Sequence, residues 1–118
     1  MLTDKQLLNN AFRELRKQGY FARQNFYYWR KWREIPEANK GLTKYVFYHH
    51  QDNKKIKNGF IEKGGMYVAW SGDGNQIVDI ISQTALRAYW NGDKDKRILI
   101  LSSTTTPDEY AEITKKKA

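Results

Sequence analysis

The sequence contains no cysteine, and this absence excludes several kinds of site at once. Without thiols the chain has no disulfide framework, no thiolate nucleophile, no zinc finger and no iron–sulfur site. The two histidines, His49 and His50, are adjacent, and on a strand they would point to opposite faces rather than toward one metal ion. We therefore expect neither a metal nor another cofactor.

Long hydrophobic runs are also missing. The N-terminal MLTDKQLLNN lacks the apolar stretch of a signal peptide, and no window approaches the roughly 20 apolar residues of a membrane-spanning helix. We expect a soluble, cytoplasmic protein with no membrane partner. A chain of 118 residues can build one core but not two, so a single domain at 1–102 is expected, followed by a lysine-ended tail or short helix at 103–118.

Acidic residues are few compared with basic ones. The chain has 21 Lys and Arg against 13 Asp and Glu, which gives a formal net charge of +8. A basic field of this size attracts polyanions or an acidic protein surface, although many proteins carry such a charge without using it. The charge alone therefore leaves the partner open.

The most distinctive segment runs from Tyr20 to Arg33, where seven aromatic and four basic residues occur without one acidic residue. Aromatic rings offer faces on which bases or a partner's side chains stack, and guanidinium groups add phosphate pairing and cation–π attraction. Protein interfaces use the same residue types as hot spots. A third interpretation is that the segment serves the fold alone, as a buried strand with arginines at its rim. The expected contact residues are Arg23, Tyr28, Trp29, Arg30, Lys31, Trp32 and Arg33.

A lysine-rich segment from Asp52 to Lys63 is expected to add charge to this surface. If Lys54, Lys55 and Lys57 lie on the same face as the aromatic run, they extend a groove that follows phosphates. Solvated lysines in an exposed loop are the ordinary alternative.

His49 is the candidate for catalysis. Imidazole titrates near neutral pH, so His49 could serve as a general base assisted by Asp52 or Arg23. The competing interpretation is a hydrogen bond between His49 and Asp52 within the fold. An enzyme is therefore the third hypothesis, after nucleic-acid binding and protein binding.

The hydrophobic pattern predicts a two-layer α/β domain. Thr3 followed by Gln6 is a capping-box pattern, and apolar residues then recur at helical spacing as far as Gly19. A second helix, capped by Asn75, is expected to place on one face Ile77, Ile80, Ile81, Thr84, Ala85 and Ala88.

Strands are expected between and after these helices. The ranges are 20–26, 44–50, 66–70 and 97–101, the last one buried on both faces, with one brief strand possible within 52–65. The expected sheet has about four strands, in the order α-β-β-(β)-β-α-β. Residues 27–34 fit a strand or a short helix equally well, and Thr106 with Glu109 forms another capping-box pattern in the tail.

Four strings, in order along the chain, resemble an uncharacterised bacterial domain family. They are FARQNF from Phe21, VFYHHQD from Val46, MYVAW from Met66 and WNGDKDKRILI from Trp90. The family has no assigned activity, so the resemblance implies none. Its members carry a cysteine cluster after the FARQNF-like segment, whereas this chain has the aromatic and basic run there, and any thiol or metal role of that cluster is absent.

The sequence as a whole indicates a small, basic, non-enzymatic binding protein. Nucleic acid is the first hypothesis for its partner. The alternative is a regulator or inhibitor of the kind that phages and mobile elements encode, holding an acidic protein with the same aromatic residues. A monomer and a homodimer both remain open, because an exposed aromatic edge strand would pair two copies.

Overall fold

The computed structural model describes residues 2–26, 44–49 and 52–115. None of the helices in these ranges has both the length and the hydrophobicity of a membrane-spanning segment. The elements in chain order are helix α1 (Asp4–Lys17), strands β1 (Phe21–Phe26) and β2 (Tyr45–His49), the 3-10 helix η1 (Asp52–Lys55), strands β3 (Ile56–Lys57), β4 (Phe60–Ile61) and β5 (Met66–Ser71), helix α4 (Gly74–Ser82), strands β6 (Arg87–Tyr89) and β7 (Ile98–Leu101), and helix α5 (Pro107–Lys115).

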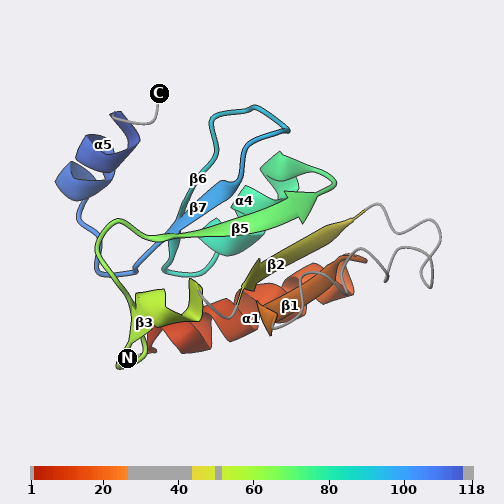
Figure 1. The fold of residues 1–118 in the computed structure, drawn as a ribbon, viewed down its shortest axis with the longest axis horizontal. Helices are drawn as coiled ribbons and strands as arrows, with labels where there is room; N and C mark the ends of the chain where they lie inside the picture. The colour runs from red at the N-terminus through yellow and green to blue at the C-terminus, as the bar shows by residue number, and fades with distance from the viewer. Residues whose placement is uncertain (1, 27–43, 50–51, 116–118) are drawn as a thin grey trace.

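Five of the strands form one mixed sheet in the order β1-β2-β5-β7-β6. Strand β1 is parallel to β2, and the other neighbours are antiparallel, while β3 and β4 form a separate hairpin. In Figure 1 the strands pass in front of α1 and α4, and α5 stands at the end of the molecule near β6 and β7. The arrangement confirms the α/β fold expected from the sequence.

Helix α1 begins and ends where local signals place its ends. The Thr3 side chain accepts a hydrogen bond from the Gln6 backbone N–H, and the Gln6 side chain accepts one from the Thr3 backbone N–H, which completes the capping box. The chain leaves the helix through Gly19, whose φ of 92° lies in the left-handed region that favours glycine. Both ends were therefore predictable from neighbouring residues.

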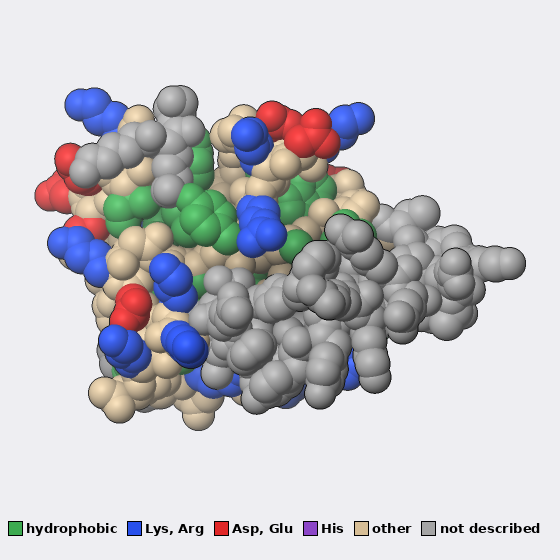
Figure 2. All heavy atoms as spheres, viewed as in Figure 1, with side chains coloured by type: hydrophobic (Ala, Val, Ile, Leu, Met, Phe, Trp, Pro, Cys, Tyr) green, Lys and Arg blue, Asp and Glu red, His purple; other side chains and the backbone are tan. Residues whose placement is uncertain are grey.

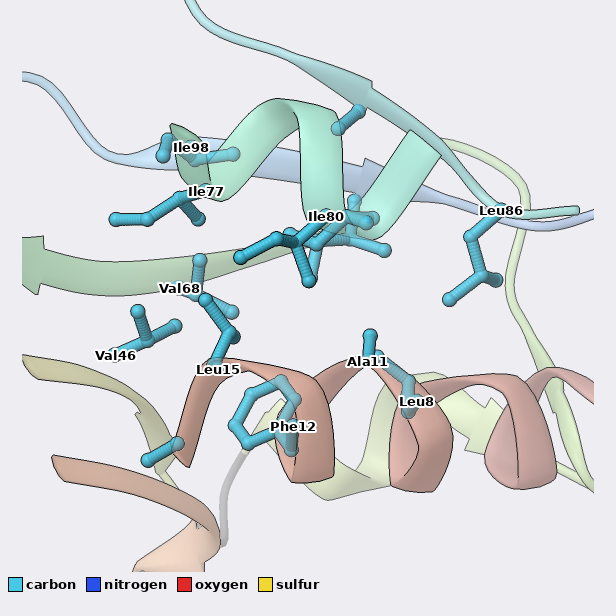
Figure 3. Close-up of a cluster of buried hydrophobic side chains, with 14 of the residues drawn as sticks. Leu8, Ala11, Phe12, Leu15, Val46, Val68, Ile77, Ile80, Leu86 and Ile98 are labelled. Atoms are coloured by element: carbon cyan, nitrogen blue, oxygen red, sulfur yellow. The ribbon is translucent and has the colours of Figure 1, made fainter. Parts of the chain in front are cut away.

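The main core lies between the two helices and the sheet (Figure 3). From α1, Leu15 lies beside the strand residues Val46 and Val68, and Leu8 and Phe12 belong to the same cluster. Helix α4 covers the rest of this sheet face with its three buried isoleucines, Ile77, Ile80 and Ile81. Each fully buried large apolar side chain stabilises the fold by about 1.5–3 kcal/mol, so this cluster supplies most of the driving force.

A carboxylate that is fully buried, Asp4, joins three distant segments. It accepts hydrogen bonds from the Ile61 backbone N–H at 2.9 Å, from the Ser103 backbone N–H at 3.0 Å and from the Ser103 hydroxyl. Desolvation by burial acts to raise the pKa of Asp4, but the hydrogen bonds outweigh it and hold the pKa below its ordinary value. The Asp4 carboxylate therefore connects the first turn of α1 with strand β4 and with the segment that follows β7.

The hairpin of β3 and β4 lies over this point. Asn58 and Gly59 both have positive φ, 53° and 86°, as a two-residue type I′ turn requires. The Gly59 carbonyl accepts a hydrogen bond from the Lys5 backbone N–H at 3.0 Å, so the turn binds an amide that the helix leaves unpaired.

The second helix is shorter than the sequence pattern predicted. It ends at Ser82, and Ala88 lies in β6 instead of on the helix. The Thr84 hydroxyl donates to the Ile81 carbonyl and accepts from the Leu86 backbone N–H at 3.0 Å, which turns the chain out of the helix. The expectation for Thr84, Ala85 and Ala88 was therefore wrong, and it arose because Ala88 continues the helical spacing although it faces the core from strand β6.

The cap of this helix also differs from the expectation. Asp73, rather than Asn75, caps it, since the Asp73 carboxylate accepts from the backbone N–H groups of Asn75 and Gln76 at 3.0 and 3.2 Å. In the tail, the expected capping box of Thr106 and Glu109 is present and starts α5. The domain boundary expected after residue 102 stays a prediction.

We predict that Asp4→Ala lowers the free energy of unfolding by about 2–4 kcal/mol, because buried donors lose a charged acceptor. Urea denaturation followed by tryptophan fluorescence at neutral pH measures the loss, with the exposed Asp79→Ala as a control of equal charge change. Because the pKa of Asp4 is depressed, its contribution is complete above the ordinary value of 3.8 and declines as the pH falls below it. A gap between wild type and Asp4→Ala that widens toward acid pH would contradict this account.

Candidate functional site

The structure describes only the beginning of the aromatic and basic run. Tyr20 is buried, and its hydroxyl donates to the Gln76 side chain at 2.9 Å, so it belongs to the core. Arg23 is exposed on β1, with its guanidinium carbon 5.3 Å from the centre of the Phe21 ring. The remaining predicted contact residues lie outside the described residues and stay predictions: Tyr28, Trp29, Arg30, Lys31, Trp32 and Arg33.

The three predicted lysines are exposed around η1 and β3. Lys57 forms an ion pair with Glu62, Nζ to Oε1 2.7 Å, and the hydrogen bond and charge of Glu62 raise the pKa of Lys57. Lys54 and Lys55 have no ion pair within the described ranges. These two are the better candidates for phosphate contacts, since Lys57 would first have to leave Glu62.

The catalytic hypothesis concerns the side chains of His49 and Asp52. Their backbones lie at the end of β2 and at the start of η1, but their side chains fall outside the part of the chain that the structure describes. The hypothesis therefore stays untested.

Sheet geometry defines a surface that we call the outer face, the side of the five-stranded sheet turned away from α1 and α4. Val46, Val68 and Ile98 point into the core, so their neighbours along each strand point to the outer face. Figure 2 shows this side, with hydrophobic side chains in a band and Lys and Arg among them. The outer face includes Phe21, Arg23, Tyr45, Phe47, Tyr67, Arg87, Tyr89 and Leu99.

Three of these residues form a row across adjacent strands. Leu99 on β7 is opposite Tyr67 on one side and Tyr89 on the other. Leu99 is 1% exposed and forms a buried floor, whereas Tyr67 is 38% exposed and forms an accessible side wall. With strands about 4.8 Å apart, the two tyrosine backbones are separated by about 10 Å.

This row lines a hollow of about 300 Å³, which we call the tyrosine hollow. Two cations, Lys96 and Arg97, stand at its rim, and both are exposed and without an ion pair in the described ranges. An apolar floor between two rings suits a planar apolar group, and the cations suit an anionic group attached to it.

Two tryptophans hold the loop that carries these cations. The Trp70 indole N–H donates to the Lys96 carbonyl and the Trp90 indole N–H to the Asp93 carbonyl, each at 2.8 Å. The two rings meet edge to face, with centroids 5.2 Å apart and an interplanar angle of 82°. These two hydrogen bonds therefore hold in place the loop at residues 93–97, which carries Lys96 and Arg97.

Tyr67, Tyr89, Lys96 and Arg97 are not among the site residues predicted from the sequence. The alternation in MYVAW was a usable signal for Tyr67, because it places this ring opposite the core. No such signal existed for Tyr89, since a helix was expected to run up to Ala88 and the strand register around Tyr89 was unknown.

The chain belongs to a domain family of unknown function, DUF6891, whose family model matches residues 2–104. The match confirms the resemblance to an uncharacterised domain family. No curated protein and no solved structure matches the chain. The matched range includes the whole five-stranded sheet with the tyrosine hollow, and it ends before α5.

We predict that Gly74→Ala displaces the Trp90 ring and thereby disturbs the loop at residues 93–97. A Cβ at Gly74 would lie 2.6 Å from Cζ3 of Trp90, so the indole ring would have to move. Overpacking of this kind costs about 1–3 kcal/mol. Urea denaturation and the near-ultraviolet circular dichroism of the tryptophans measure the effect, with the exposed Ser82→Ala on the same helix as control. Two unchanged signals would show that Trp90 does not depend on this contact.

Proposed function

We propose that the protein is a small, non-enzymatic, cytoplasmic protein that binds single-stranded nucleic acid on the outer face of its sheet. The observation that carries this proposal is the tyrosine hollow, in which Tyr67 and Tyr89 stand on either side of buried Leu99 with two cations at the rim.

The size and lining of the hollow favour a nucleobase as the inserted group. At about 300 Å³ it lies at the small end of the range for ligand sites, so one planar group fits it better than an extended ligand. Stacking of a base on an aromatic side chain contributes about 1–3 kcal/mol and requires no particular base. Binding without strong sequence preference follows from this chemistry.

The positive charges of the outer face favour a nucleic-acid strand whose path crosses the β-sheet. Arg97 directly precedes β7 and Arg23 lies on the edge strand β1, and three strand spacings separate these two strands by about 14 Å. A single strand on this path would place a base in the tyrosine hollow and phosphates near both arginines. The predicted contact residues at 28–33 follow β1 in the chain and stay a prediction.

The alternative proposal is a regulator or inhibitor that binds an acidic protein with the same face. Exposed Tyr67 beside Arg97 favours it, because tyrosine and arginine are the residues that hot spots of protein interfaces use most. The two proposals differ in salt dependence, since counterion release governs binding to a phosphate backbone.

We predict that Tyr67→Ala weakens binding of a labelled oligothymidylate by about 5- to 150-fold, the loss of one stacked base. Arg97→Ala should weaken binding of all sequences and lower the salt slope by about one. Fluorescence anisotropy at two salt concentrations measures both effects. Lys17→Ala, which removes an exposed charge from α1 on the other side of the sheet, is the matched control and should change little.

The wild-type protein decides between the proposals. No saturable binding of the oligonucleotide at low salt would discard nucleic acid and favour the protein partner. Saturable binding that Tyr67→Ala and Arg97→Ala leave intact would keep nucleic acid but remove the tyrosine hollow as its site.

A further inference from the structure

Asn91 is a further polar residue that lines the tyrosine hollow, and its carboxamide is held in one orientation. Its side-chain oxygen accepts a hydrogen bond from the Asp93 backbone N–H at 2.9 Å. A backbone N–H bonds to the oxygen of a carboxamide and not to its NH2 group, so this contact identifies the two ends of the Asn91 amide. The NH2 group has no partner among the described residues and is available as a donor.

Neighbouring contacts keep Asn91 in place without a ligand. The Trp90 indole N–H donates to the Asp93 carbonyl at 2.8 Å, and the Asp93 carboxylate accepts from the Asp95 backbone N–H at 2.9 Å. Trp90 also packs against the core and meets the Trp70 ring edge to face. The Asn91 donor is therefore positioned in advance, which reduces the ordering cost of binding.

Strand register brings Asn91 and Arg97 to opposite positions of the hairpin that β6 and β7 form. Tyr89 is paired with Leu99, and both belong to the outer face. Two residues beyond this pair in each direction are Asn91 and Arg97, which the same register sets opposite each other on the same side of the sheet. Both line the tyrosine hollow. A carboxamide and a guanidinium therefore lie at the same end of it.

The polar groups at this end of the hollow are donors. The Asn91 NH2 group, the Lys96 ammonium and the Arg97 guanidinium donate hydrogen bonds and accept none. The hydroxyls of Tyr67 and Tyr89 can do either, and no carboxylate is among the described residues that line the hollow. A base that offers two neighbouring acceptors satisfies these groups, whereas a base that offers a donor leaves polar groups unpaired.

Guanine is the base whose edge fits this set of donors. It carries two adjacent acceptors, O6 and N7, whereas adenine carries N7 beside an amino group, cytosine an amino group, and thymine one acceptor beside a methyl group. Asparagine reads adenine with its oxygen and its nitrogen together, but the Asn91 oxygen already binds Asp93. This contact blocks the adenine pairing and leaves donation to guanine open.

We propose that the tyrosine hollow prefers guanine among the bases of a single strand, with Asn91 as the specificity-determining residue. This inference rests on the proposed function, to which it adds a preference at one base. The base lies over Leu99, and Asn91 donates to one of its acceptors while Arg97 donates to the other. A guanidinium has five N–H donors, so this contact leaves donors for a phosphate. Stacking supplies affinity for any base, and the two hydrogen bonds supply the preference.

The test compares strands in which only one base can enter the hollow. Short single strands of abasic sugar and phosphate carry one central guanine, adenine or 7-deazaguanine, and each competes with labelled oligothymidylate for the wild-type protein in an anisotropy titration. We expect the guanine strand to bind at least about fivefold more tightly than the adenine strand. The 7-deazaguanine strand keeps O6 but lacks the N7 acceptor, so it should bind less tightly than the guanine strand.

A matched pair of variants tests the role of Asn91. Asn91→Asp keeps an oxygen for the Asp93 N–H and exchanges the NH2 donor for an acceptor, so the ratio of guanine to adenine affinity should fall to about one or below. Asn75→Asp makes the same change at an exposed position of α4, on the other side of the sheet, and should leave this ratio as in the wild type.

Each outcome bears on a different statement. Equal affinities of the guanine and adenine strands, with oligothymidylate still bound, would overturn the guanine preference and leave the proposed function in place. A ratio that Asn91→Asp does not change would overturn the role of Asn91. Absence of oligothymidylate binding at low salt would remove the proposed function and the guanine preference together.

Discussion

The buried carboxylate of Asp4 is the interaction on which the rest of the arrangement depends. A charge without contact with water is tolerated only when donors surround it, and here the donors come from Ile61 and Ser103, far apart in the sequence. Satisfying this charge therefore sets the position of α1 relative to both β4 and the end of β7. The core of leucines and isoleucines supplies more energy, but apolar packing is not directional, whereas this carboxylate accepts hydrogen bonds in one arrangement.

Helices α1 and α4 both lie on one side of the sheet, and the side chains of the other side therefore form the outer face. The inner side is apolar, and the outer face carries Tyr67, Tyr89 and the arginines of β1 and β6. The same alternation that builds the core thus aligns two tyrosines across Leu99. Trp70 and Trp90 add rigidity at the rim, because their indole N–H groups hold the loop that carries Lys96 and Arg97. The outer face and the core are two consequences of one strand register.

Local chemistry could be predicted from the sequence, and pairing between distant segments could not. The capping boxes at Thr3 and Thr106, the buried strand β7 and the family resemblance were all identified from short stretches of residues. The second helix was overextended because Ala88 continues its apolar spacing, although Ala88 faces the core from strand β6. The predicted site was centred on the densest aromatic run, which includes Arg23 of the outer face but not the tyrosine hollow, since the hollow exists only where three strands meet.

The sequence by itself determined the α/β class, the ends of α1, the excess of positive charge and the absence of cysteine chemistry, because each depends on composition or on residues within one or two helical turns. Tertiary structure alone decided which rings share the outer face, that Asp4 is a buried acceptor, and that the Lys5 amine meets Tyr48. These features depend on strand order and register, which arise from contacts between residues separated by dozens of positions. Such contacts stabilise the protein only once the whole sheet has formed.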